Sequence, residues 1–181
     1  FNYGYALFSS KNTTEAEKYL SKVTTSPVYG SQAKYYLGFI AYQQDDYAGA
    51  SQRFDQITDQ KVLDEKLSYY QADLNFKLGK FEEAIALAKK QIQKADRQEK
   101  SELSKIIGES YFNLNQFENA VPYLLDYKGR NGKWSNTDYY LLGYSYYKQG
   151  DYTNAIQQFN KIIGGTNNVS QNAYYHLAEC Y

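Results

Sequence analysis

The residues that could carry out chemistry are few and scattered in this chain. The 181-residue sequence contains one histidine, His176, and one cysteine, Cys180. Neither belongs to a recognisable pairing of a nucleophile with a base, and a zinc site needs more Cys and His ligands than these two. The adjacent pairs Asp45-Asp46 and Glu82-Glu83 cannot face each other across a substrate and fit charges at helix starts. The sequence therefore predicts no enzyme activity, no metal and no cofactor.

The side chains that occur in unusual number are aromatic. The chain has 22 tyrosines and 9 phenylalanines. A tyrosine side chain offers a large contact area, has little rotamer entropy to lose and carries a hydroxyl group that tolerates water, which is why tyrosine is enriched at protein interfaces. The residue types present therefore favour recognition of another molecule by contact.

A repeated spacing of small residues defines the elements that must carry these side chains. Alanines recur at steps of 34, 34, 36 and 35 residues, at Ala16, Ala50, Ala84, Ala120 and Ala155. A second small residue stands twelve positions before each of them, at Gly4, Gly38, Ala72, Gly108 and Gly143. Glycine inside a helix costs about 0.5–1 kcal/mol relative to alanine, so its recurrence indicates that two backbones approach closely there.

The second repeat shows the predicted elements most clearly. Its segments 33–42 and 47–57 both carry apolar residues at helical spacing, and neither alternates with the period of two that a half-buried strand would show. Asp46 precedes the second segment, as Asp151 does in the fifth repeat, where a carboxylate can cap the first turn of a helix. Each repeat is therefore predicted to be a helix, a turn and a second helix.

The helix pair, the step length and the residues at fixed positions resemble the tetratricopeptide repeat family. The matching residues of the second and fifth repeats are Leu37, Gly38, Tyr47, Ala50 and Phe54, and Leu142, Gly143, Tyr146, Tyr152, Ala155 and Phe159. The resemblance spans essentially the whole chain, although the third and fourth repeats are weaker and the first is degenerate. It implies an all-α fold, a right-handed α-solenoid of tandem helix-turn-helix repeats, and a non-catalytic scaffold for protein–protein interaction.

The repeat register predicts a single array over residues 1–181. It gives a partial repeat at about 1–30, full repeats at 31–64, 65–100, 101–135 and 136–170, and the start of a further repeat at 171–181. Because both ends fall inside predicted first helices, we expect the chain to be a piece of a longer array. Residues 128–134 lengthen the connection between the repeats at 101–135 and 136–170. We expect Trp134 to cover the seam between these repeats rather than to anchor a ligand.

One face of each first helix is not needed to pack the helix pair. At about 100° per residue, Tyr35, Phe39 and Tyr42 share an arc of the second repeat away from Leu37 and Gly38. The family resemblance implies that this face lines a concave groove in which extended peptides or partner helices bind. The predicted partner-binding residues are Tyr35, Phe39, Tyr42, Tyr69, Asp73, Phe76, Lys105, Glu109, Phe112, Tyr140, Tyr144 and Tyr147, and the first repeat continues the stripe with Phe1, Tyr5 and Phe8.

Several alternatives stay open at this point. The column Phe8, Tyr42, Phe76, Phe112 and Tyr147 can instead pack against the neighbouring repeat. The whole chain can be a structural spacer within a longer repeat protein, or a module that binds a glycan or small ligand, since tyrosine rings also stack on sugars.

The sequence disfavours several partner classes. With 20 basic and 20 acidic residues, the chain has no broad positive field for nucleic acid, and no apolar run approaches the roughly 20 residues of a membrane span. Repeats that clamp chaperone C-terminal tails use a lysine followed four residues later by an asparagine, whereas Lys105 is followed by Glu109, which would repel a carboxylate. The segment 26–38 resembles modules of bacterial cell-envelope proteins, which favours the periplasm or cell envelope over the cytoplasm; the sequence otherwise leaves the location unknown.

Overall fold

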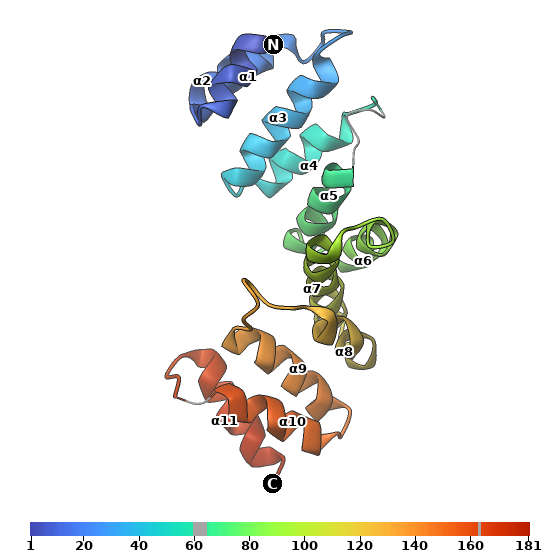
Figure 1. Ribbon diagram of the computed structural model, residues 1–181, viewed down its shortest axis with the longest axis vertical. Helices are drawn as coiled ribbons and strands as arrows, with labels where there is room; N and C mark the ends of the chain where they lie inside the picture. Colours follow the sequence, from blue (N-terminus) through green and yellow to red (C-terminus); the bar gives the residue numbers. More distant parts are fainter. Residues whose placement is uncertain (60–64, 163) are drawn as a thin grey trace. The chain divides into compact units, whose positions relative to one another are not determined.

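The computed structural model describes residues 1–59, 65–162 and 164–181, which form α-helices joined by turns and loops (Figure 1). The described residues contain no strand, and Arg130 and Lys133 form only an isolated antiparallel bridge. The predicted all-α helical-repeat fold is confirmed. The chain divides into two compact units, Phe1–Lys80 (unit 1) and Phe81–Tyr181 (unit 2). The predicted end of the second repeat, at residue 64, lies outside the described residues.

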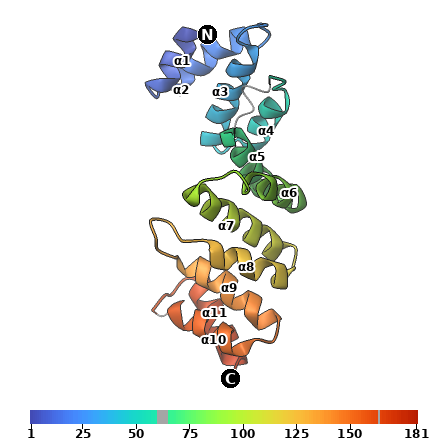
Figure 2. The ribbon, with the colours of Figure 1, turned by 45° about the vertical axis from the view of Figure 1, so that its right-hand side comes forward.

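Within each unit, consecutive helices pack as pairs. In unit 1, α1 pairs with α2 and α3 with α4 (Figure 1). The described elements of unit 1 are α1 (Asn2–Ser9), α2 (Thr13–Leu20), η1 (Ser21–Val23), α3 (Gly30–Gln43), α4 (Tyr47–Asp55) and α5 (Glu65–Lys77). In unit 2, α7 pairs with α8 and α9 with α10, while α6 packs on α7 and α11 on α9 (Figure 2). The elements of unit 2 are α6 (Phe81–Gln91), α7 (Arg97–Asn113), α8 (Phe117–Asp126), α9 (Asn136–Lys148), α10 (Tyr152–Phe159), η2 (Asn160–Ile162) and α11 (Asn168–Glu179).

The turns inside the repeats share one backbone geometry. A residue with positive φ recurs at the repeat spacing, at Lys11 (64°), Asp45 (62°), Gly79 (73°), Asn115 (57°) and Gly150 (75°). Gly, Asn and Asp adopt this left-handed conformation most readily. The next residue is the N-cap of the second helix: the Asp46 side chain accepts the Gly49 N–H at 2.9 Å, and the Asp151 side chain accepts the Asn154 N–H at 3.2 Å. The capping role predicted for these two aspartates is confirmed.

The small residues stand where the helices of a pair cross. The five alanines of the repeat register are all 0% exposed. A Cβ atom added to Gly38 would lie 2.5 Å from a ring carbon of Phe54, and one added to Gly143 would lie 2.8 Å from a ring carbon of Phe159. A Cβ atom on Gly4 would lie 2.9 Å from the Leu20 side chain, and one on Gly108 would lie 2.9 Å from the Leu124 side chain; both leucines belong to the second helix of the pair. The predicted close approach of the two helices is confirmed.

Within each unit, successive repeats contact each other through two positions of their first helices. The first position lies four residues after the small residue of a repeat, as Phe8 does after Gly4. It contacts the position directly after the small residue of the next repeat, as Phe39 stands after Gly38. In two joints this contact is between rings: the centroids of Phe8 and Phe39 are 5.9 Å apart, and those of Phe112 and Tyr144 are 5.7 Å apart. The contacts support the alternative that this column packs against the neighbouring repeat.

In two other joints the same positions form a phenol–carboxylate hydrogen bond. The Tyr42 hydroxyl donates to Asp73 at 2.5 Å, and the Tyr147 hydroxyl donates to Glu179 at 3.0 Å. Burial, followed by the bond to Asp73, raises the pKa of Tyr42 well above its usual range. The bond to Glu179 raises the pKa of Tyr147 to about 12, because an ionised phenol would face the carboxylate.

The helix crossing in the second repeat can be tested by coupling two substitutions. We expect Gly38→Ala to lower the free energy of unfolding by about 1–3 kcal/mol, because the new methyl group overlaps the Phe54 ring. In a Phe54→Ala background the same change should cost nothing or stabilise, since alanine has the higher helix propensity. Ala72 and Ala88 already stand at these two positions of the third repeat. Urea unfolding of both single variants and the double variant gives the coupling energy, and a value near zero would contradict the proposed overlap.

The joint between α9 and α11 can be tested at alkaline pH. Because the pKa of Tyr147 is raised in the folded chain from 10.0 to about 12, its contribution to stability is complete below pH 10 and is lost as the pH rises towards 12. We expect Glu179→Gln to shift tyrosine ionisation, followed by ultraviolet absorbance, to lower pH. The nearby carboxylate of Glu179 also raises the pKa of Tyr175. Glu179→Gln should therefore lower the pKa values of Tyr147 and Tyr175 in the natural background, and that of Tyr175 alone in a Tyr147→Phe background. If Glu179→Gln changed the tyrosine ionisation curve equally in both backgrounds, the hydrogen bond between Tyr147 and Glu179 would be excluded.

Candidate functional site

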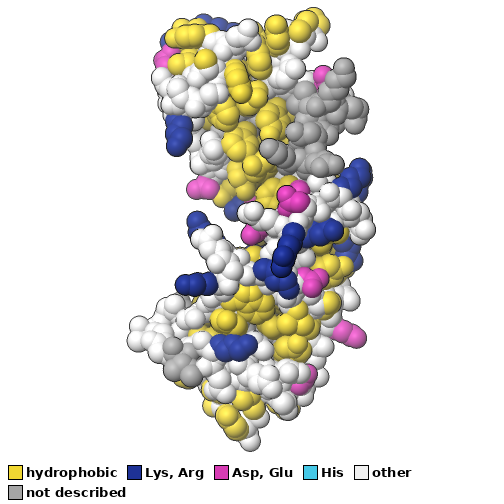
Figure 3. Space-filling model, in the orientation of Figure 1, with side chains coloured by type: hydrophobic (Ala, Val, Ile, Leu, Met, Phe, Trp, Pro, Cys, Tyr) yellow, Lys and Arg dark blue, Asp and Glu magenta, His cyan; other side chains and the backbone are white. Residues whose placement is uncertain are grey.

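The predicted binding residues of unit 1 lie on α3 and α5 as half-buried side chains. The rings of Tyr35, Phe39 and Tyr42 form a continuous stacked row along α3, with 6.4 Å between the centroids of each neighbouring pair. Figure 3 shows hydrophobic side chains gathered over this part of unit 1. The equivalent positions of α5 are Tyr69, Asp73 and Phe76. The structure joins the two sets directly, because Asp73 accepts the Tyr42 hydroxyl and also lies 3.9 Å from Nζ of Lys77.

Two aromatic residues that sequence reasoning missed pack against these rows. Tyr70 of α5 lies against Phe39 and Tyr42, with ring centroids 5.0 Å and 5.3 Å apart. Tyr36 makes the equivalent contacts one repeat earlier, with Phe1, Tyr5 and Phe8. A signal was present in the sequence: the column Tyr36, Tyr70, Ile106 and Leu141 is large and apolar at the repeat spacing. One repeat therefore covers part of the aromatic row of the repeat before it.

In unit 2 the predicted charged residues form an ion-pair network within the chain. The Nζ atom of Lys105 lies 3.1 Å from Asp138 and 3.7 Å from Glu109, and it stands 4.6 Å from the ring centroid of Tyr127. Burial opposes the charge on Lys105, but the two carboxylates outweigh it and raise its pKa. Lys105 therefore links α7 to α9.

Asp138 was missed because it stands in a helix cap and not in the predicted column. It is 7% exposed and accepts hydrogen bonds from the backbone N–H and the hydroxyl of Ser135. These bonds hold its carboxylate in the position that Lys105 contacts. Because Glu109 and Asp138 both face Lys105, the lysine stands in a negative surrounding that would disfavour a carboxylate ligand.

The predicted aromatic residues of α9 surround the only histidine of the chain. Tyr140 and Tyr144 stack with centroids 5.8 Å apart, and Tyr147 follows at 5.9 Å. His176 of α11 lies 6.2, 4.9 and 5.0 Å from the three rings. Its Nδ1 atom is 2.9 Å from Glu179. His176 occupies the column of Tyr36 and Tyr70, so here too the following repeat covers the aromatic row.

A reactive thiol, a metal-binding cluster and a membrane-spanning helix would each point to a different function. Cys180 is half-buried, and burial raises the pKa of its thiol, which disfavours the reactive thiolate. In the parts of the chain that the structure describes, no cluster of three or more His, Cys, Asp or Glu residues could hold a metal ion. No described helix has the length and apolar character needed to cross a membrane.

Comparisons with known proteins agree with the repeat register. The family model described as tetratricopeptide repeat matches residues 37–99. The model described as anaphase-promoting complex, cyclosome, subunit 3 matches residues 130–181. A search of curated proteins gave no match.

A solved structure shares the fold. The chain is similar to the C-terminal part of a TPR repeat-containing protein from Cytophaga hutchinsonii, with a TM-score of 0.66 and 18% sequence identity over 99% of this chain and 78% of that one. At this identity the likeness concerns the fold alone. The match over residues 37–99, together with the helix pairs and the small residues at their crossings, shows that the chain contains repeats of the tetratricopeptide family.

Proposed function

We propose that the chain is a non-catalytic scaffold that binds a peptide or a partner protein on the aromatic rows of its first helices. Tetratricopeptide repeats generally mediate protein–protein interactions. The observation that carries the proposal is the pair of rows of neighbouring rings in the same register, Tyr35–Phe39–Tyr42 on α3 and Tyr140–Tyr144–Tyr147 on α9. Rings that already hold each other in place lose little conformational entropy when a ligand packs on them.

The rows differ along their length in what they can offer a ligand. Tyr42 and Tyr147 use their hydroxyls to bind Asp73 and Glu179 of the next repeat. We therefore expect the direct ligand contacts at the other end of each row, at Tyr35 and Tyr140. We also propose a location in the periplasm or cell envelope, as expected from the sequence of residues 26–38.

Site-specific photo-crosslinking tests the proposal while keeping a large aromatic side chain at each position. The photoreactive residue p-benzoylphenylalanine replaces Tyr35 or Tyr140 in the first helices, or Ala48 or Thr153 at equivalent exposed positions of the second helices α4 and α10. Irradiation in an extract of the source organism should give one discrete crosslinked protein from Tyr35, Tyr140 or both. The Ala48 and Thr153 variants, with the same probe on another face, should not give it.

Two results would replace the proposal. No crosslink at either first-helix position, in variants whose circular dichroism is unchanged, would favour a structural spacer. Absence of a protein crosslink together with a saturable change in tyrosine fluorescence on adding an oligosaccharide would favour glycan binding. Tyr35→Ala and Tyr140→Ala should weaken capture of the crosslinked protein by at least about tenfold if they carry its contacts.

A further inference from the structure

The long loop between α8 and α9 is held in place at both ends. The backbone N–H of Lys128 donates to the hydroxyl of Ser101 at 2.9 Å, and the indole N–H of Trp134 donates to the carbonyl oxygen of Tyr127 at 2.8 Å. Between them the chain makes a tight turn in which a Cβ atom on Gly129 would lie 2.4 Å from the backbone of Lys133. Trp134 packs on the core cluster that contains Ala120, Leu124 and Leu142, so the expectation that it covers a seam between repeats is confirmed.

The remaining surface of Trp134 lines an open pocket of about 620 Å³, which we name the Trp134 pocket. Lys128 and Lys133 of the loop, Lys161 of η2, and the rings of Tyr127 and Tyr139 also line it. The rings of Trp134 and Tyr139 are 5.1 Å apart, and Nζ of Lys161 stands 5.2 Å from the ring centroid of Tyr139. The pocket therefore combines an aromatic surface, formed by Tyr127, Trp134 and Tyr139 and named here the aromatic floor, with the side chains of three lysines.

No carboxylate lines the Trp134 pocket. Over residues 1–59, 65–162 and 164–181, none of its three lysines lies within the 4.0 Å ion-pair distance of an acidic side chain. Lys161 donates to Gln158 at 3.3 Å, and Lys128 donates to the carbonyl oxygen of Leu125 at 3.4 Å. The hydrogen-bond acceptors of Lys161 and Lys128 are therefore both uncharged, and the pocket is positive in a chain whose formal net charge is zero.

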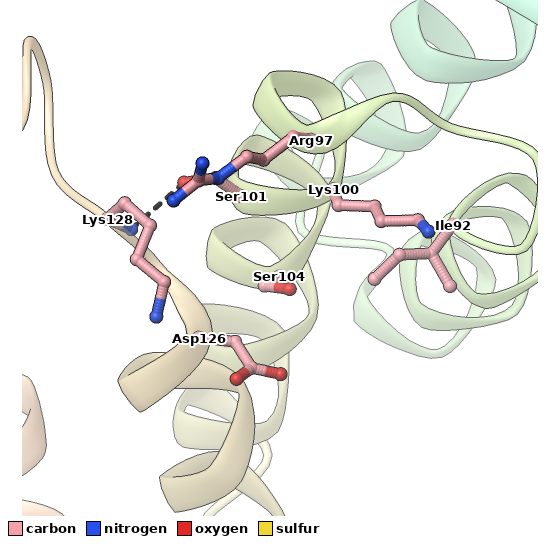
Figure 4. Close-up of a pocket in the computed structure, with 7 residues that line it drawn as sticks. All are labelled: Ile92, Arg97, Lys100, Ser101, Ser104, Asp126 and Lys128. Carbon is pink, nitrogen blue, oxygen red and sulfur yellow. Dashed lines mark hydrogen bonds between the residues drawn. The ribbon is translucent and has the colours of Figure 1, made fainter.

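A second hollow of about 410 Å³ extends the positive surface beyond Lys128 (Figure 4). Arg97 and Lys100 of α7 line it together with Lys128, and Asp126 is its single acidic residue. Figure 4 shows the Arg97 side chain extending towards Ser101 and the start of the loop. Lys and Arg side chains are also visible over this part of unit 2 in Figure 3.

We propose that the Trp134 pocket binds an acidic peptide segment of a partner protein. Its carboxylates pair with Lys128, Lys133 and Lys161, while an aromatic or aliphatic side chain of the peptide packs on Trp134 and Tyr139. A peptide fits better than a nucleic acid, because Asp126 beside Lys128 interrupts the continuous positive track that a phosphate backbone requires. The pocket lies at helix ends and a loop, and it contains none of the aromatic-row residues, so this binding is separate from the function proposed above.

Binding of a fluorescein-labelled peptide, Glu-Asp-Phe-Asp-Glu, measured by anisotropy at low salt, tests the proposal. Trp134, the only tryptophan, gives a second readout through its emission. We expect saturable binding that Lys133→Glu weakens by at least about tenfold. Lys148→Glu makes the same charge change at an exposed position of α9 outside the pocket and should weaken binding by less than about twofold, the screened effect of a distant charge. Tyr35→Ala should leave binding unchanged.

Matched probes separate the two halves of the proposal. The neutral peptide Gln-Asn-Phe-Asn-Gln should bind much more weakly, which tests the lysines, and Glu-Asp-Ala-Asp-Glu should also lose affinity, which tests the aromatic floor. The proposal is wrong if the acidic peptide does not bind, if the neutral peptide binds equally well, or if Lys148→Glu weakens binding as much as Lys133→Glu. Tighter binding of an oligodeoxythymidylate than of the peptide would overturn it in favour of a nucleic-acid site.

Discussion

The close crossing of the paired helices at Gly4, Gly38, Gly108 and Gly143 is the contact on which the other features depend. At Gly38 and Gly143 the backbone of the first helix meets a phenylalanine ring of the second, with no room for a side chain between them. This contact buries the small-residue side of the first helix and brings its partner within packing distance. The aromatic side of the same helix faces away from this crossing. There it contacts the next repeat, and we propose that a ligand binds there too.

The aromatic rows therefore serve as joints between repeats and as candidate binding surfaces. Ring pairs such as Phe8–Phe39 contribute about 0.5–1.5 kcal/mol beyond their buried area, and a phenol–carboxylate bond such as Tyr42–Asp73 is charge-assisted. The contacts between successive repeats thus differ in chemistry: apolar at Phe39, polar at Asp73 and Glu179, and charged at Lys105. Because the positions nearest the joint pack against the next repeat, the ligand contacts that we propose are at Tyr35 and Tyr140.

Sequence reasoning was most successful where the relevant interaction is local. The small residues, the helix pairs and the caps at Asp46 and Asp151 depend on neighbours within one repeat, and periodicity reports such neighbours. The left-handed turn residues were not predicted, although Asp45, Asn115 and Gly150 stand at the repeat spacing in residue types that favour positive φ. The rows Tyr35–Phe39–Tyr42 and Tyr140–Tyr144–Tyr147 follow from helix geometry alone, although their role in binding remains a proposal.

By itself, the sequence determined the repeat, its two helices and the face on which the aromatic side chains stand, since each follows from spacing along one helix. Only the tertiary structure decided which side chains meet across repeats: Tyr42 bonds to Asp73, 31 residues away, and Lys105 to Asp138, 33 residues away. It also assembled the Trp134 pocket, from a loop and from Lys161 on η2. The physical reason is that these contacts depend on how one helix pair is rotated against the next, and the hydrophobic period of a single helix carries no information about that rotation.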